Sequence, residues 1–367
     1  MKAITLVPGT TTVSLQDVPE PVISAPDEIK LRTLQVGICG TDREQVAGGR
    51  ADAPAGKQKL VIGHEMFGQV VEIGEKVRSV RPGNYAMFTV RRGCGECPAC
   101  LNNRSDMCYT GKYTERGIKG ADGFQAEYVV DKEQYVIKIP DAIQEIGVLT
   151  EPMSVAAKAI DEAIAIQAAR LSGFDRTENW LQGKKALVAG IGPIGLMAAF
   201  ALRLQGTDVI GMDIVDENSL RPTILKMIGG TYSDGRKVRL EDYDEVYGQF
   251  DFVFEATGIA GLQIQLIDTL GINGIYVATG IPAGERPLTL PVGSLMQQLV
   301  LKNQVVVGSV NAGVHHYKMA VQYLEETKAR WPQAIERIIT ERVHFTKFDT
   351  AMHTQNENEI KVVVDWQ

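Results

Sequence analysis

One glycine-rich turn restricts the fold of this chain more than any other segment, because it joins an apolar strand directly to an apolar helix. Residues 185–190, KALVAG, have the short apolar run of a buried strand, and residues 194–206, IGLMAAFALRLQG, have the composition of a helix. The turn between them is GIGPIG, a G-x-G-x-x-G sequence. Its glycines allow a tight turn, close approach of a pyrophosphate to the backbone, and close packing of helix on strand. The alternative is a plain strand–turn–helix connection without a ligand. We expect a dinucleotide site that contains Gly190, Gly192, Pro193, Ile194 and Gly195.

The segments that follow extend this unit into a sheet. Four further apolar runs, DVIGMD, FDFVFEATG, GIYVATG and QVVVGSV, come at intervals that leave room for helices. Short buried strands separated by helices predict a parallel α/β sheet. We therefore expect residues 156–310 to form a doubly wound, parallel-sheet (Rossmann) domain that binds a dinucleotide.

The N-terminal part of the chain has a different pattern. Short strands broken by Gly and Pro, such as EIKLRTLQVGI, GQVVEIGEKV and FQAEYVVD, predict a β-rich domain. After residue 310 the sequence predicts a helix, HHYKMAVQYLEETKAR, and a closing strand, IKVVVDW. A chain of 367 residues is long for one core. We assign residues 1–155 and 311–367 to a second domain, and predict that a helix near residues 157–171 leads from one domain to the other.

An acidic residue follows the second strand of the predicted nucleotide domain. Asp213 closes DVIGMD, eighteen residues past Gly195, and the next basic residue is Arg221. A carboxylate there accepts hydrogen bonds from the adenosine ribose hydroxyls and repels a 2′-phosphate. The sequence therefore favours NAD over NADP. The alternatives are an acid that only caps the loop after the strand, and Arg221 folding back to bind a 2′-phosphate.

Four of the five cysteines lie in one short segment, CGECPACLNNRSDMC. A disulfide cluster is unexpected in so long a chain whose first residues lack a signal-peptide pattern. Ordinary buried cysteines do not suit the surrounding Gly, Pro, Asn and Asp either. Four thiolates at this spacing fit a tetrahedral Zn²⁺, and four sulfurs leave no open position, so the site is expected to be structural. The predicted lobe spans about residues 92–110, with the ligands Cys94, Cys97, Cys100 and Cys108.

Two further residues are of the types that bind zinc. Cys39 stands in VGICGTD and His64 in GHE. A lone cysteine after an apolar strand is usually a small core residue, and a lone histidine is usually on the surface. A carboxylate, from Glu65 or Glu151, could instead complete a second metal site. The residues alone leave both interpretations open.

The composition limits the classes of partner that this chain is expected to bind. The hydrophobic fraction of 44% and the charged fraction of 23% are ordinary for a globular protein. A net charge of −7, from 45 acidic and 38 basic residues, argues against a nucleic-acid-binding surface. No apolar run approaches the length of a membrane span. We expect no nucleic-acid or membrane partner, and reduced cysteines in a cytoplasmic protein.

Taken in order, these motifs resemble the medium-chain, zinc-dependent alcohol dehydrogenase family over essentially the whole chain. The matching segments are GICGTD, GHE with GQVVEIGEKV, the four-cysteine lobe, a Glu-Pro pair, the glycine motif and EATG. Within the family the chain is most similar to archaeal-type glucose 1-dehydrogenases, through RRGCGEC, GKYTERGIKGADGF, GSVNAGVHH and IKVVVDW. The resemblance implies a GroES-like, β-rich catalytic domain beside the Rossmann domain, and a homodimer or homotetramer.

The resemblance also assigns roles to single residues. Cys39 and His64 would hold a catalytic Zn²⁺, with Glu65 or Glu151 as a further ligand. Asp42 would orient His64 by contacting the ring nitrogen that does not bind the metal, and Thr41 would contact the reacting hydroxyl. Glu115, Glu151 and Asn311 would bind the substrate, and Thr257, Gly258 and Asn311 the cofactor.

The chain departs from its relatives at two places. Glu44 occupies the region where many alcohol dehydrogenases have a proton-relay histidine, and residues 213–216, DIVD, replace basic residues of NADP-dependent glucose enzymes. The expected function is zinc-dependent oxidation of an aldose at C1 to the aldonolactone, with hydride transfer to NAD, or to NADP as the alternative. D-Glucose is the expected aldose, with D-galactose and D-xylose as further substrates, and two Zn²⁺ per chain. The alternative within the family is a polyol or secondary-alcohol dehydrogenase; the candidate zinc ligands argue against a non-enzymatic relative.

Overall fold

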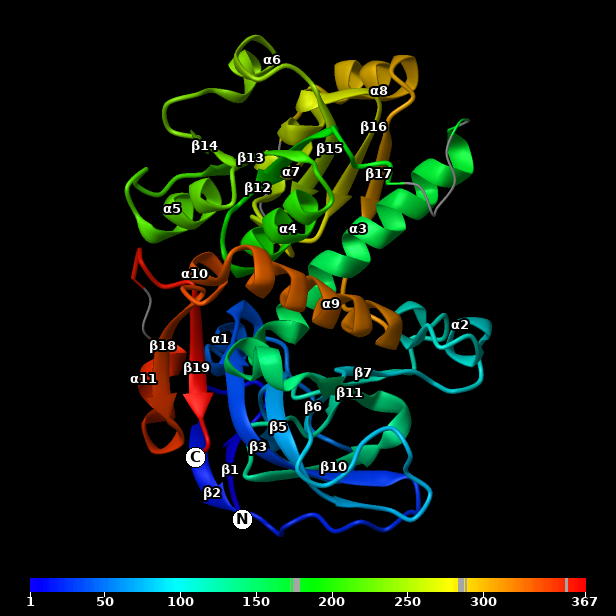
Figure 1. The fold of residues 1–367 in the computed structure, drawn as a ribbon, viewed down its shortest axis with the longest axis vertical. Coiled ribbons are helices and arrows are strands. Elements are labelled where there is room, and N and C mark those ends of the chain that lie inside the picture. Colours follow the sequence, from blue (N-terminus) through cyan, green and yellow to red (C-terminus); the bar gives the residue numbers. More distant parts are fainter. Residues whose placement is uncertain (172, 174–178, 283–286, 288, 354–355) are drawn as a thin grey trace. The chain divides into compact units, whose positions relative to one another are not determined.

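The chain folds into two units, which Figure 1 shows in a computed structural model. The structure describes residues 1–171, 173, 179–282, 287, 289–353 and 356–367. The first unit contains Met1–Ser154, Asn311–Lys328 and Glu336–Gln367, and the second contains Val155–Val310 and Ala329–Ile335. The short segment 329–335, which the sequence analysis assigns to the β-rich domain, therefore belongs to the second unit. One reason is Trp331, whose ring lies against Phe200 with centroids 6.4 Å apart.

The first unit is built around the long strand β3 (Glu28–Ile38), the segment that the sequence predicts as a strand. Its sheet has the order β11-β6-β5-β3-β19-β18, and β10 also pairs with β3. Along one edge, β10 pairs with the first half of β3 and β19 with its last four residues. This register joins the closing strand of the chain to the N-terminal part. The other strands are β5 (Glu65–Ile73), β6 (Tyr85–Phe88), β10 (Tyr128–Lys132), β11 (Val136–Ile139), β18 (Ile339–His344) and β19 (Lys361–Asp365).

Two small sheets and several helices complete the first unit. The strands of the sheet β2-β1-β4 are β1 (Lys2–Leu6), β2 (Val13–Asp17) and β4 (Leu60–Val61). The strands of the sheet β7-β8-β9 are β7 (Arg91–Arg92), β8 (Thr114–Arg116) and β9 (Gly120–Ala121). The helices are α1 (Gly40–Val46), α2 (Pro98–Leu101), η1 (Ser105–Met107), η2 (Glu133–Tyr135), η3 (Asp141–Leu149), α9 (Val314–Arg330), whose last two residues belong to the second unit, η6 (Phe345–Lys347) and α11 (Phe348–His353).

The second unit is a six-stranded parallel sheet with the order β14-β13-β12-β15-β16-β17. The chain enters at β12, moves to one side through β13 and β14, and then continues from β15 to the other side. The direction of winding therefore reverses between β12 and β15, which confirms the predicted doubly wound fold. The strands are β12 (Lys185–Ala189), β13 (Asp208–Asp213), β14 (Thr231–Asp234), β15 (Phe250–Glu255), β16 (Leu270–Ala278) and β17 (Val305–Gly308).

Helices cover this sheet, and its central strands are buried on both faces, as their apolar sequences predict. One core cluster includes Leu187, Val253, Tyr243 and Tyr276. In the described part of the chain, no helix is both long and apolar enough for a membrane crossing. The helices are α3 (Thr150–Arg170), which contributes residues to both units, α4 (Pro193–Leu204), α5 (Leu220–Met227), η4 (Leu240–Asp242), α6 (Tyr243–Val246), α7 (Ala260–Gln265), η5 (Leu266–Thr269), α8 (Val292–Leu301) and α10 (Pro332–Ile335).

Candidate active site and metal centres

The glycine turn after β12 has the backbone that its sequence demands. Gly190 has a φ of +84°, a conformation that residues with a side chain rarely adopt. An added Cβ at Gly195 would lie 1.8 Å from the Gly190 carbonyl oxygen, so helix and strand approach too closely for any side chain. At Gly192 nothing lies within 4 Å of an added Cβ, so the backbone there is open to a ligand. Helix α4 begins at Pro193 with Gly192 as its N-cap, which directs its N-terminus, and Ile194 in its first turn, toward that space.

The predicted cofactor residues of the second unit gather at the carboxyl ends of three neighbouring strands. Gly190 follows β12, Asp213 ends β13, and Thr257 follows β15. Asp213 Oδ2 accepts a hydrogen bond from the N–H of Ile191 at 3.1 Å, and an added Cβ at Gly190 would lie 3.0 Å from Thr257 Cγ2. Ligands of doubly wound sheets bind at this reversal of strand order, so the arrangement can hold a dinucleotide.

A buried carboxylate that the sequence analysis did not single out holds the loop after β15. Glu255 is fully buried, and its Oε1 accepts the Thr257 N–H and hydroxyl, both at 2.6 Å, and the Gly258 N–H at 2.9 Å. Its Oε2 accepts from Gln263 Nε2 at 2.6 Å. An acid at the end of an otherwise apolar strand was the available signal, because such a group requires donors when it is buried.

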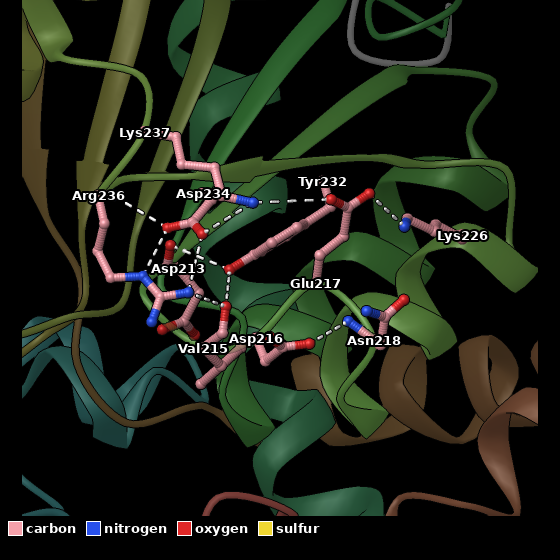
Figure 2. Close-up of polar contacts among 10 residues, drawn as sticks. All are labelled: Asp213, Val215, Asp216, Glu217, Asn218, Lys226, Tyr232, Asp234, Arg236 and Lys237. Carbon is pink, nitrogen blue, oxygen red and sulfur yellow. Dashed lines mark hydrogen bonds and ion pairs between the residues drawn. The ribbon is translucent and has the colours of Figure 1, made fainter.

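The loop that carries Asp213 is tied to β14, as Figure 2 shows. The Tyr232 hydroxyl donates to the carbonyls of Asp213 and Val215 at 3.1 and 2.7 Å. Arg236 pairs with Asp234 at 2.8 Å and also donates to the Val215 carbonyl at 3.1 Å. Two arginines therefore accompany a loop that is acidic in sequence, since Arg221 Nη1 also lies 3.7 Å from Asp213 Oδ2.

The four cysteines of the lobe come together in the first unit. Their Sγ atoms all lie within 4.8 Å of one another, and each is a free thiol. Cys97 is the N-cap of α2, Cys100 lies within that helix, and Cys108 directly follows η1. An added Cβ at Gly93 would lie 2.3 Å from Cys100 Sγ. Short helical turns and a glycine therefore converge four sulfurs from fifteen consecutive residues.

The electrostatics of the lobe fit a bound cation. Hydrogen bonds, first from the Thr110 hydroxyl, lower the pKa of Cys108 to about 6, whereas burial raises the pKa of Cys100 to about 12. Without a cation, Cys100 and Cys108 therefore differ in how readily their thiols ionise. A Zn²⁺ would allow four thiolates, and a closed sulfur set is the donor chemistry of structural zinc.

The second candidate metal site is built on the N-terminus of α1. Cys39 is the N-cap of this helix, and its Sγ accepts the Thr41 N–H at 3.2 Å. The same Sγ lies 3.0 Å from His64 Nε2. Asp42 accepts the Cys39 N–H at 2.9 Å, and its other oxygen lies 3.5 Å from His64 Nδ1. Asp42 thus contacts both residues, while the ligand atoms of Cys39, His64 and Glu65 lie within 4.8 Å of one another.

This group also favours a positive charge. Burial alone would lower the pKa of His64, but the charges of Cys39 and then Asp42 raise it well above its ordinary value. A bound Zn²⁺ would supply such a charge, and sulfur, imidazole nitrogen and carboxylate are donors that Zn²⁺ accepts. Three protein ligands would leave a position open for a reacting group. The residues present therefore fit a catalytic metal.

Lys361 is the main residue of this site that the sequence analysis missed. Its side chain is 1% exposed, and its Nζ lies 2.7 Å from both Glu65 oxygens and 3.1 Å from the Ile38 carbonyl. An added Cβ at Gly37 would lie 2.2 Å from Glu65 Oε2, so this pair also needs a glycine behind it. The available signal was a lysine within IKVVVDW, because a buried ammonium requires an anionic partner.

Glu151 lies beside this group rather than within it. It stands in the first turn of α3 and is buried. Burial, together with the negative charge of Glu65, raises its pKa to about 7. Its carboxyl therefore changes protonation near neutral pH. Glu44, which departs from the expected histidine, pairs instead with Arg50 at 3.2 Å on the surface.

The two other predicted substrate residues form a group of their own. Asn311 Nδ2 donates to Glu115 Oε1 at 2.7 Å, although the two residues are 196 positions apart in sequence. Asn311 has a φ of +60°, which asparagine tolerates better than most residues. Arg91, which the sequence analysis quoted only as part of RRGCGEC, also donates to Glu115 Oε1.

Comparison with known protein families assigns both parts of the chain. Residues 25–141 match the alcohol dehydrogenase GroES-like domain, and residues 144–366 match the glucose dehydrogenase C-terminus. Among curated relatives, glucose 1-dehydrogenase 2 of Vulcanisaeta moutnovskia is 37% identical, over 100% of this chain and 99% of that protein. Glucose 1-dehydrogenase of Thermoproteus tenax is 36% identical over 100% of both chains.

A solved structure agrees with these relatives over the whole length. Glucose dehydrogenase from Haloferax mediterranei, in complex with NADP, Zn and gluconolactone, matches with a TM-score of 0.88 and 31% identity, covering 100% of this chain and 99% of that one. A GroES-like domain and a doubly wound nucleotide domain together define the medium-chain dehydrogenase class. Within that class, the chain belongs to the glucose dehydrogenase family.

Proposed function

We propose that this enzyme oxidises an aldose, D-glucose above all, at C1 to the aldonolactone and transfers the hydride to NAD. The observation that carries the proposal is the group of Cys39, His64 and Glu65, an open set of zinc donors in a chain of the glucose dehydrogenase family. The complex of the Haloferax relative with NADP, Zn and gluconolactone supports the same chemistry. D-Galactose and D-xylose are proposed as further substrates.

The proposed chemistry divides between bound groups and side chains. Oxidation at C1 requires a proton to leave the hydroxyl oxygen and a hydride to leave the carbon. Cys39 and His64 would hold a zinc ion, which would supply Lewis acidity for the loss of the hydroxyl proton, and NAD would be the hydride acceptor. The product is the lactone, with NADH and one proton released.

The side chains around the metal position have distinct proposed roles. Thr41 is proposed to start the route by which the hydroxyl proton leaves, since it lies in the first turn of α1, two residues after Cys39. Asp42 orients His64 through Nδ1. Glu151, whose pKa lies at about 7, holds or releases a proton at its carboxyl near neutral pH. Glu65, bound to Lys361 through both oxygens, is proposed as an exchangeable rather than permanent ligand.

For the sugar, we propose that Glu115 and Asn311 hydrogen-bond the hydroxyls away from C1. A carboxylate and an amide supply an acceptor and a donor that can distinguish sugar epimers, since an unpaired buried polar group is costly. Asn311, Thr257 and Gly258 are also proposed to contact the cofactor. The lobe is proposed to hold a second, structural zinc, which gives two Zn²⁺ per chain.

NAD is proposed as the preferred cofactor because Asp213 stands where a 2′-phosphate would be repelled. The relative from Haloferax was solved with NADP. Two arginines near the Asp213 loop, Arg221 and Arg236, are the residues through which NADP would bind instead. Activity with both cofactors decides between the two.

We also propose that the enzyme is a homodimer or homotetramer in the cytoplasm. Strand β17 ends the order of the six-stranded sheet, and an edge strand can pair with a second copy of itself. Exposed apolar side chains lie on this strand and just before it, with Val306 on β17 and Val300 and Leu301 in α8, the preceding helix. Val306→Lys is expected to lower the molecular mass measured by light scattering, and an unchanged mass would place the interface elsewhere.

The decisive experiment is a panel of aldoses and polyols assayed with NAD and NADP, combined with zinc analysis. The proposal predicts turnover of D-glucose, lactone as product, and about two zinc ions per chain. Preference for a polyol or a simple secondary alcohol would select the alternative activity within the family. Absence of turnover in zinc-loaded enzyme with any of these substrates would refute the proposed function.

A further inference from the structure

Two consecutive arginines on β7 are placed alike but serve different carboxylates. The side chains of Arg91 and Arg92 are both largely buried, 8% and 12% exposed. Each guanidinium stacks on a tyrosine, Arg91 on Tyr113 at 4.0 Å and Arg92 on Tyr135 at 3.9 Å. Successive residues of a strand face opposite sides of the sheet, so the two reach different groups although their environments match.

Arg91 reaches the proposed sugar-binding carboxylate. Its Nε and Nη2 donate to Glu115 Oε1 at 3.1 and 2.9 Å. The backbones of Arg91 and Glu115 are also direct partners in the pairing of β7 with β8. With the Asn311 amide at 2.7 Å, three donors hold the same oxygen. The carboxylate is therefore fixed through Oε1, which leaves Oε2 to receive a ligand.

The remaining nitrogen of Arg91 contacts the cysteine lobe. Nη1 donates to the carbonyl of Asp106 at 2.7 Å, and Asp106 lies in η1, between Cys100 and Cys108. The Asp106 side chain is buried and pairs with Arg104 at 2.9 Å. An added Cβ at Gly313 would lie 2.6 Å from Asp106 Oδ1, so the lobe also contacts the segment just after Asn311.

We propose that Arg91 is a positioning residue that fixes the Glu115 carboxylate to the cysteine lobe, and that the lobe thereby sets the affinity and epimer selectivity for the sugar. The inference deepens the proposed function and rests on it. It gives the structural zinc a role in substrate binding, because the metal holds the loop from which the Asp106 carbonyl projects.

The physical reason is the directional contact of the guanidinium, whose Nε and Nη2 converge on one carboxylate oxygen while Nη1 binds a carbonyl. A guanidinium presents a planar fork, whereas a lysine ammonium is a point charge that cannot hold one oxygen and one carbonyl in the same geometry. Loss of the fork would let the Glu115 carboxylate rotate, and a displacement of about 1 Å in a binding group can reduce turnover about a hundredfold.

The test compares Arg91→Lys with the matched control Arg92→Lys. Arg92 donates through Nε and Nη2 to Asp131 Oδ2 at 3.2 and 2.7 Å and through Nη1 to the Thr89 carbonyl at 2.7 Å, a closely similar set of contacts. We expect Arg91→Lys to raise the KM for D-glucose about ten- to a hundredfold and to leave the KM for NAD unchanged. The ratio of kcat/KM for D-glucose to kcat/KM for D-galactose should move closer to one. Zinc content and melting temperature should match those of Arg92→Lys.

A second pair of measurements addresses the lobe. Cys97→Ser should raise the sugar KM in the same direction, and the double variant with Arg91→Lys should raise it little further, because both changes break one connection. If the increases in sugar KM caused by the two single substitutions multiply in the double variant, Arg91 and the lobe act independently, and the proposal is overturned.

The outcomes separate this inference from the proposed function. If the native enzyme fails to oxidise any aldose, the proposed function is wrong. If it oxidises D-glucose and Arg91→Lys changes the sugar KM no more than Arg92→Lys does, the positioning role alone is wrong. A fall in zinc content or melting temperature confined to Arg91→Lys, with the sugar KM unchanged, would make Arg91 a purely structural residue and would equally overturn the inference.

Discussion

The two candidate metal sites of the first unit are assembled in opposite ways. The lobe takes all four sulfurs from residues 94–108 and needs only two short helical turns to converge them. The other site combines the N-cap of α1 with His64, which directly precedes β5, and Glu65, which begins it, and its counter-ion comes from the last strand. Lys361 and Glu65 are 296 positions apart.

The difference teaches how each site can fail. A site built from one loop depends on its own residues and on the metal that closes it. A site built from distant strands depends on the register of the whole sheet, because β19 must pair with β3 to bring Lys361 behind Glu65. We expect the lobe to affect local stability and the sugar affinity proposed above but not the chemical step, and the assembled site to affect both activity and folding.

The largest effect is expected at the assembled site. Cys39→Ser or His64→Ala should reduce turnover by about a thousandfold or more, since loss of a Lewis acid removes several kcal/mol of transition-state stabilisation. NAD binding, measured by fluorescence titration, should remain close to native, because the glycine turn, Asp213 and Thr257 lie in the second unit. Retained turnover in a zinc-free preparation of either variant would refute the catalytic assignment.

The next effect concerns the buried ion pair. Lys361→Met leaves Glu65 buried without its cation and should cost about 3–5 kcal/mol of unfolding free energy. Denaturant unfolding measures the loss. The double variant Lys361→Met with Glu65→Gln should recover part of it, because the uncompensated charge is gone. If the double variant is no more stable than the single one, packing rather than charge explains the effect.

In contrast to Cys39 and His64, the lobe should affect stability more than the chemical step. Cys97→Ser should lower the zinc content from about two ions per chain to one and lower the melting temperature by several degrees, since metal binding contributes directly to folding. The chemical step, measured as kcat at saturating sugar, should change little. A large fall in kcat with normal stability would erase the distinction between the two sites.

The cofactor loop in the second unit gives a smaller effect. Asp213→Asn should weaken NAD binding by about 1.5–3 kcal/mol, or roughly ten- to a hundredfold, through loss of charge-assisted hydrogen bonds. Asp213→Ser combined with Ile214→Arg should shift the preference toward NADP, because arginine supplies a bidentate phosphate contact. The measurement is kcat/KM for both cofactors. A native enzyme that already prefers NADP would assign the 2′-phosphate to Arg221 or Arg236.

Acid should weaken metal binding at both sites, because it protonates their ligands. The pH dependence of stability therefore needs a reference from a cluster of charged side chains that binds no metal. Burial alone would raise the pKa of Asp131, but Arg116 and Arg92 lower it below its ordinary value. The unfolded chain therefore binds more protons than the folded one just below pH 4, and the cluster stabilises the protein above that pH. Asp131→Asn should cost about 1.5–3 kcal/mol at pH 7. The gap to native should close as the pH falls through the lowered pKa, and a gap independent of pH would mean that the charge is not involved.

Much of the site was predictable because its signals are local. The role of each glycine in GIGPIG follows from backbone geometry within six residues, and Gly190, Gly192 and Gly195 have the conformations and surroundings that those roles require. The four lobe cysteines come together for the same reason. Arg91, Glu255 and Lys361 escaped prediction because a charged residue in sequence does not name its partner.

The sequence by itself determined the doubly wound sheet, the β-rich partner unit and the lobe, because hydrophobic periodicity, glycine conformation and cysteine spacing act over short stretches of chain. Only the tertiary structure decided that Lys361 occupies both oxygens of Glu65, that Arg91 joins Glu115 to Asp106, and that Arg236 reaches the Asp213 loop. These contacts depend on strand register between residues up to hundreds of positions apart. A shift of one residue in β7 or β19 would turn Arg91 or Lys361 to the opposite face of its strand.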